Sequence, residues 1–150
     1  MRFAIFSDLH DNIDGFHHVL ADVASQRADQ LIFLGDAGRA VQIFVELQQR
    51  GIICLFGNWE VSGLRRLPGQ LAAWVGAWPA TVQLGQAIFC HATPDMPATA
   101  LTTTAAVQHM AGGIGWATLF PRLNRQEHAR WAALAVLEHA DLRVAFHGHT

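Results

Sequence analysis

The chain has 150 residues, of which 51% are hydrophobic and 15% are charged, and its net charge is −2 with histidine neutral. This size and composition allow one domain with a substantial core and exclude a disordered chain. The ten cations are all arginine and form no basic stripe, so electrostatic binding of nucleic acid is not favoured. No apolar run approaches the ~20 residues of a membrane helix. Strand-like sequence starts at Arg2 without a preceding leader, and Cys54 and Cys90 lie in apolar runs as expected of buried thiols, so we expect a cytoplasmic protein.

The first third of the chain alternates strand-like and helix-like segments. Residues 2–7 form a compact β-rich run, and Asn12 is expected to cap a helix whose apolar positions recur at helical spacing up to Ala24. Residues 30–34 and 52–56 are predicted as buried strands, and the helix between them covers residues 41–47 and stops at Gly51. Near-continuous apolar strands alternating with amphipathic helices indicate a parallel sheet covered on both faces.

The rhythm changes after Gly57. Pro68 and Pro79 punctuate a tryptophan-rich, helical stretch, and residues 80–84 and 87–90 are predicted to be two strands around a tight turn. Residues 93–123 are the least regular segment and are interpreted either as a lid over a site or as a plain connection. Asn124 and Glu127 resemble a capping box at the start of a helix through residue 137, and a last strand covers residues 143–146.

Five short motifs fall in a fixed order along the chain: Asp8-Leu9-His10, Gly35-Asp36, Gly57-Asn58, His91 and Gly148-His149. Each of the first three sits where an apolar run ends. Because the carboxyl ends of parallel strands meet at one edge of a sheet, these side chains are expected to converge there. Carboxylate, imidazole and amide ligands at one edge are the ligand set of a dinuclear metal centre for hydrolysis.

Each motif also has an ordinary structural interpretation. Asp8 and Asp36 are in positions where an aspartate commonly caps the following helix. Asn58 alone is more often a turn residue than a ligand. The ordered set of six polar residues, rather than any single one, favours the metal site.

The ordered set resembles the calcineurin-like metallophosphoesterase superfamily, whose series reads DxH, GD, GNH(D/E), H and GHxH. The resemblance runs over residues 1–150 and implies a single metallophosphoesterase domain with a four-layer αββα sandwich of mainly parallel strands. It implies that Asp8 and His10 serve a first divalent metal ion and that Asp36 bridges both ions. The remaining implied ligands of the second ion are Asn58, His91 and His149. The nitrogen and oxygen ligands suit Mn, Fe or Zn, with Mn favoured, and a hydroxide bridging the two ions is implied to attack phosphorus.

Four positions depart from the family pattern, of which Ala92, after His91 where glycine is frequent, is a minor change. Trp59 occupies the place of a histidine that commonly protonates the leaving group, whereas Glu60 keeps the acidic residue and is expected to act in catalysis by orienting a histidine or a metal-bound water. Asp11 replaces a glycine and either adds charge beside the site or caps a helix. The sequence reaches Thr150 before the second histidine of GHxH, so we expect an N-terminal portion of a longer protein, with a fold that is incomplete at the C-terminus.

The sequence therefore predicts a metal-dependent phosphoesterase in which Asp36, Asn58 and Glu60 take part in catalysis. A phosphodiester is favoured as substrate, because diesters with acidic leaving groups depend least on a general acid. Arg39 and Asn58 are candidate contacts for the substrate phosphate, although a solvated arginine is the plainer interpretation of Arg39.

Two other classes of function remain as alternatives. The first is a non-catalytic binding scaffold with this fold, favoured by Trp59 and by the incomplete last motif. The second is phosphotransfer through an aspartyl intermediate, which would require Asp-x-Asp after the first strand, where this chain has Asp8-Leu9-His10. The expected partner is a small phosphoester, and neither its identity nor the oligomeric state follows from the sequence.

Overall fold

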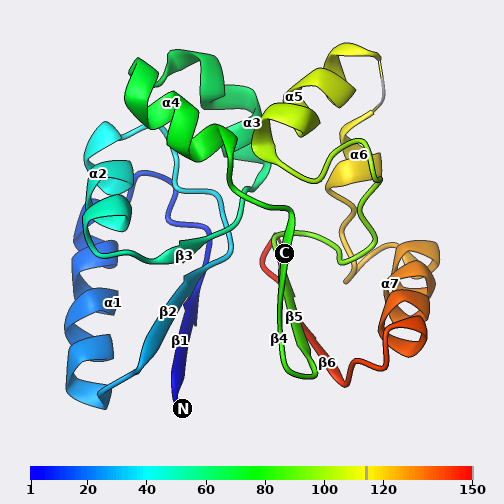
Figure 1. The fold of residues 1–150 in the computed structure, drawn as a ribbon, viewed down its shortest axis with the longest axis horizontal. Helices are drawn as coiled ribbons and strands as arrows, with labels where there is room; N and C mark the ends of the chain where they lie inside the picture. Colours follow the sequence, from blue (N-terminus) through cyan, green and yellow to red (C-terminus); the bar gives the residue numbers. More distant parts are fainter. Residues whose placement is uncertain (114, 150) are drawn as a thin grey trace.

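Two β-sheets face each other in the centre of the molecule, with helices on both outer sides (Figure 1). The computed structural model describes residues 1–113 and 115–149. Ile114, in the segment expected to be irregular, and Thr150, in the last motif, lie outside the described residues.

The first sheet consists of parallel strands in the order β1 (Phe3–Phe6), β2 (Gln30–Phe33) and β3 (Ile53–Cys54). Its connections are α1 (Ile13–Gln26) and α2 (Val41–Gln49), which cover the outer face of this sheet. The side chain of Asn12 accepts a hydrogen bond of 2.8 Å from the Gly15 N–H, so the predicted cap of α1 is confirmed.

The second sheet has the order β4 (Thr81–Leu84), β5 (Ala87–Cys90) and β6 (Val144–Phe146). β4 and β5 form the predicted hairpin and are antiparallel, whereas β5 and β6 are parallel. The outer side of this sheet is covered by α7 (Glu127–His139), which lies at the opposite end of the molecule from α1 and α2 (Figure 1). The layers are therefore helix, sheet, sheet and helix, as the family resemblance implies.

The inner face of the first sheet meets the second sheet rather than more helices. Ile32, Leu34 and Leu55 pack with Phe89 of β5 in one buried cluster. The expectation that this sheet is covered on both faces is confirmed, with helices on one face and the second sheet on the other. The sequence pattern of a buried strand is the same whether a helix or another sheet covers it, because both remove the same side chains from water.

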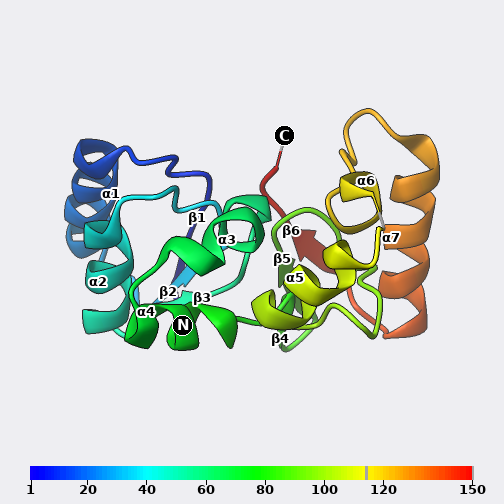
Figure 2. The same cartoon turned by 90° about the horizontal axis from the view of Figure 1, so that it is seen from above.

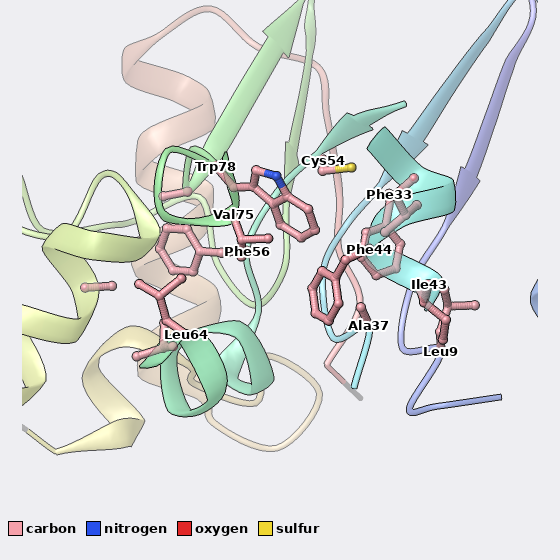
Figure 3. Close-up of a cluster of buried hydrophobic side chains, with 14 of the residues drawn as sticks. Leu9, Phe33, Ala37, Ile43, Phe44, Cys54, Phe56, Leu64, Val75 and Trp78 are labelled. Carbon is pink, nitrogen blue, oxygen red and sulfur yellow. The ribbon is translucent and has the colours of Figure 1, made fainter. Parts of the chain in front are cut away.

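The larger core lies between the first sheet and the helices (Figure 3). Phe33 and Phe44 pack against Trp78, with ring centroids 6.2 Å and 5.9 Å from the indole. Cys54 belongs to this core, and both cysteines are buried and free, as predicted. This packing holds the carboxyl ends of the three parallel strands in fixed positions.

The connections between and beyond the sheets form a group of short helices close to the edge where the strands end (Figure 1). They are α3 (Asn58–Gly63), the 3-10 helix η1 (Leu64–Arg66), α4 (Gly69–Gly76), α5 (Thr103–Ala111) and α6 (Trp116–Leu119). No helix in residues 1–113 and 115–149 is both long enough and apolar enough for a membrane span.

Two local predictions are wrong. The segment expected to be irregular contains α5 and α6, and the side chain of Thr102 caps α5 by accepting a hydrogen bond of 3.2 Å from the Ala105 N–H. The capping box at Asn124 does not form, since α7 begins at Glu127 after Gln126, without a side-chain cap. Polar residues close to a helix start compete for the capping position, and the turn that precedes the helix decides between them.

Candidate metal centre

The predicted ligands converge at the carboxyl edge of both sheets. Asp8 follows β1, Asp36 follows β2, and Asn58 begins α3 after β3. His91 follows β5 and His149 follows β6, and these two strands point the same way as the first sheet (Figure 1). Residues from five strand ends therefore meet at one place between the sheets.

The first of two clusters, here called the outer group, consists of Asp8, His10 and Asp36, whose potential ligand atoms lie within 4.8 Å of one another. His10 Nε2 lies 3.5 Å from Asp8 Oδ1 and 3.9 Å from Asp36 Oδ2. The side chains of His10 and Asp8 are 45% and 32% exposed, so this group opens to solvent.

The second cluster, here called the inner group, consists of Asp36, His91 and His149 within the same 4.8 Å limit. His91 Nε2 lies 3.5 Å from Asp36 Oδ2 and 3.2 Å from His149 Nδ1. The side-chain oxygen of Asn58 is also 3.2 Å from His91 Nε2, so it joins the same cluster. His91 and Asp36 are each only 2% exposed.

The donor set of the inner group fits a cation. His91 Nδ1 lies 3.0 Å from the Leu34 carbonyl, which can only accept, so Nδ1 carries a proton and Nε2 faces the cluster. Asp36 Oδ2, Asn58 Oδ1 and His149 Nδ1 lie 3.2–3.5 Å from that nitrogen, and polar atoms crowded in this way are stabilised by positive charge among them, either a proton or a metal ion. Burial lowers the pKa of His91, but the Asp36 carboxylate outweighs it and the net pKa is raised, as expected where the cluster stabilises positive charge. The pKa of His149 is lowered, by burial and by the neighbouring His91.

Asp36 belongs to both groups. Its Oδ2 faces His10 and His91, and its Oδ1 accepts a hydrogen bond of 2.9 Å from the Trp59 N–H. Gly57 lies so close to this carboxylate that a Cβ there would collide with Asp36 Oδ1. The close approach of the two turns explains why position 57 requires glycine.

The backbone at the cluster is held in unusual conformations. Asp8, His10, Asp36 and His149 have φ angles of 55°, 46°, 64° and 55°, in the left-handed region. Aspartate and histidine tolerate this region better than most residues, although it costs energy outside glycine. Residues in such conformations persist where the surrounding structure over-determines them, and they concentrate at functional sites.

Two turns of the first sheet are tied together through the backbone. The Asp8 N–H donates to the Gly35 carbonyl at 3.0 Å, and the His10 N–H donates to the Asp36 carbonyl at 3.1 Å. The Asp11 side chain continues this connection by accepting from the N–H groups of Arg39, at 2.5 Å, and Ala40, at 2.6 Å. The Asp11 carboxylate therefore accepts hydrogen bonds from the two residues before α2, and it does not cap α1, which follows it in sequence.

Glu60 is a positioning residue. Its buried carboxylate accepts hydrogen bonds from the N–H groups of Asp36 at 2.9 Å, Ala37 at 2.8 Å and Gly57 at 2.6 Å. The prediction that Glu60 orients a histidine or a water is wrong, because both oxygens are occupied by the backbone of the ligand-bearing turns. Burial and the Asp36 carboxylate raise the pKa of Glu60, against the three N–H groups that favour its charged form.

Trp59 and Arg39 lie beside the outer group. The indole of Trp59 contacts the His10 ring edge-on, with centroids 5.2 Å apart. The guanidinium of Arg39 lies over the same indole, 5.3 Å from its centroid, and Arg39 is exposed.

Two contributors to the site are not visible as motifs. The Ser7 hydroxyl donates to Asp8 Oδ2 at 2.5 Å, and Phe120 packs against His91 and His149 with centroids 5.9 Å and 6.0 Å away. Phe120 lies far from either histidine in sequence, so no local pattern predicts this contact. His147, beside the last motif, is exposed, and its Nδ1 lies 2.9 Å from the Gly148 carbonyl.

Comparison with known proteins agrees with this geometry. The model of the calcineurin-like phosphoesterase superfamily domain matches residues 1–150. The chain belongs to this superfamily. Among solved structures, a metallophosphoesterase from Sphaerobacter thermophilus is 21% identical with a TM-score of 0.53, covering 65% of this chain and 49% of its own. Yfce, a phosphoesterase from E. coli, is 19% identical with a TM-score of 0.41, over 61% of this chain and 57% of its own.

This chain thus spans about half the length of the solved structures that it resembles. The likeness to the Sphaerobacter thermophilus protein supports the fold. No curated protein matches this chain.

Proposed function

We propose that the protein is a metal-dependent phosphoesterase that uses two divalent ions, one in the outer group and one in the inner group. The observation that carries the proposal is the position of Asp36, whose carboxylate is shared by two three-residue clusters. A carboxylate has two oxygens and a negative charge, so one side chain can hold two cations close together. Superfamily membership supports the same reaction class.

Each of the ligand residues has a distinct part in this proposal. Asp8 and His10 complete the outer group, whereas His91, His149 and Asn58 complete the inner group. When bound, two divalent ions lower the pKa of the attacking water between them and polarise the phosphoryl group. Mixed nitrogen and oxygen ligands suit Mn, Fe or Zn, and we propose Mn.

The polar side chains beside the clusters favour a phosphodiester. An indole cannot donate a proton at neutral pH, so Trp59 leaves its position without a general acid. Arg39 is exposed, with its guanidinium over Trp59, where it is available to contact a phosphate oxygen along with the Asn58 amide. A substrate whose leaving group departs as a stable anion therefore suits this site best, and buried free cysteines support a cytoplasmic location.

Metal analysis combined with an ester screen tests the proposal. Protein purified in the presence of Mn²⁺ is expected to hold about two ions per chain and to hydrolyse bis(4-nitrophenyl) phosphate faster than 4-nitrophenyl phosphate. Removal of the ions by EDTA should abolish the activity, and addition of Mn²⁺ should restore it. Metal-loaded protein that hydrolyses neither ester would contradict the proposal.

The second candidate is a binding scaffold without catalysis, and the observation that favours it is Trp59 in the position of the family histidine. Well under one bound ion per chain, under conditions that saturate other metalloproteins, would favour the scaffold.

A further inference from the structure

One face of α6 extends the inner group toward solvent. Trp116 and Phe120 are four residues apart, and the Phe120 N–H donates to the Trp116 carbonyl at 2.7 Å, so the two side chains share one face of the turn. Phe120 contacts the ring of His149, with centroids 6.0 Å apart, and Trp116 contacts Phe120 with centroids 5.5 Å apart. The three rings form a continuous row that starts at a predicted metal ligand.

The exposure of the rings changes along this row. Phe120 is 6% exposed, whereas Trp116 is 45% exposed. A tryptophan with this much exposed surface, backed by a buried phenyl ring, presents a flat apolar surface one ring away from the polar cluster.

The other wall of the site is different. α3, which carries Trp59, and α6 lie on opposite sides of the segment that follows β6 (Figure 2). Arg39 lies over the indole of Trp59 and His10 meets it edge-on, so Trp59 already has partners. Trp116 is therefore the better candidate for contact with a ligand.

We propose that Trp116, backed by Phe120, is a binding subsite for a planar aromatic ring carried by the phosphoester substrate. This proposal rests on the proposed function, because the phosphoryl group must lie at the metal ligands for the ring to reach α6. His149 and Trp116 both contact Phe120, so only one ring lies between the inner group and Trp116. Stacking on an indole tolerates any planar ring, so the subsite selects aromatic over aliphatic esters.

The test compares two ligands that differ in one ring. Adenosine 5′-monophosphate and ribose 5-phosphate carry the same phosphate and sugar, and only the first has a base. Calorimetric titration of the Mn²⁺-loaded protein should show that adenosine 5′-monophosphate binds about tenfold more tightly or better, from the usual strength of base stacking. In Trp116→Ala this ratio should fall to about one while ribose 5-phosphate binds unchanged.

Two matched variants control for other causes. Trp116→Phe should keep most of the ratio, since it keeps a ring. Trp131→Ala removes another exposed tryptophan, on α7, and should leave the ratio as in the parent protein. Equal affinity of the parent for the two ligands, absent binding of adenosine 5′-monophosphate, or a ratio that survives in Trp116→Ala would each overturn the subsite. Hydrolysis of the model diester by the same preparation reports on the proposed function separately.

Discussion

The outer and inner groups share Asp36 but differ in how the fold supports them. In the inner group His91 and Asp36 are buried, and His91 directly follows the central strand β5 and is oriented by a backbone carbonyl. The outer group lies on turns, and His10 is 45% exposed. A buried, pre-oriented set of ligands binds a cation more tightly than an exposed set, because less freedom is lost on binding and water competes less. We therefore expect one firmly held ion and one more labile ion.

The strongest test of the shared carboxylate is Asp36→Asn. The change removes the one charge common to both groups, so both ions should be lost, and turnover should fall by at least about 100-fold, as is common for residues that support a metal site. Metal content and diester hydrolysis measure this effect, and Asp14→Asn, an exposed change at the start of α1, is the control. Two ions and full turnover in Asp36→Asn would disprove the bridging role.

Trp59→His tests the proton donor beside the outer group, because the Trp59 indole contacts the His10 ring. A histidine there can supply the proton that an indole cannot, so hydrolysis of esters with poor leaving groups should rise by up to ~10²–10⁴-fold. Rates for a series of substituted aryl and alkyl esters measure the dependence on leaving-group pKa, which should be steep in the parent protein and shallower in the variant.

A shallow dependence in the parent protein would show that another group donates the proton. In that event Trp59→His should mainly lower stability by opening a cavity. Trp131→His, far from the cluster on α7, should change neither property.

The relative strength of the two groups is tested by comparing His10→Gln with His91→Gln. In the parent protein, titration with EDTA should remove the two ions in separate steps, the outer one at a concentration about 10- to 100-fold lower. His10→Gln should retain about one ion, held as tightly as the inner ion of the parent. His91→Gln should weaken the tightly held ion, and His139→Gln at the exposed end of α7 should leave both steps unchanged. Removal of both ions from the parent in one step would mean that the groups do not differ.

Glu60→Gln should have the smallest effect of these variants. It should destabilise the turns that carry ligands of both groups. The amide NH₂ of glutamine would face backbone N–H groups that now donate to a carboxylate, leaving buried donors without an acceptor. The expected cost is about 1–3 kcal/mol of the free energy of unfolding. Denaturant titration of the metal-free protein measures it, with the exposed Glu138→Gln as the control. An unchanged midpoint would show that the carboxylate does not hold the two turns together.

Much of the first sheet and most of the candidate site could be predicted from local patterns. The alternation of apolar runs with helical periodicity located β1, α1, β2 and α2, and the Asn12 cap formed as expected. The ligand-bearing turns followed from polar residues placed where strands end, since parallel strands bring those ends to one edge. The resemblance to the superfamily supplied the second sheet, which periodicity did not predict.

Other features depended on the folded structure, for identifiable reasons. A strand pattern does not record whether a sheet or a helix covers its second face, so periodicity left this open, and the packing of Phe89 between the sheets decides it. α5 and α6 were missed because proline, glycine and threonine around them dominate the local signal, and Phe120 reaches His91 through space alone.

The amino-acid sequence by itself determined which residues stand at the strand ends, because chain order and periodicity are local properties. Only the tertiary structure decided what each does there. In the folded protein, Glu60, a candidate catalytic group, accepts hydrogen bonds from three backbone N–H groups. Asp11 accepts from the backbone of the residues before α2, which are distant in sequence. Both assignments depend on which backbone donors surround a carboxylate, and those donors come from segments that meet only when the chain folds.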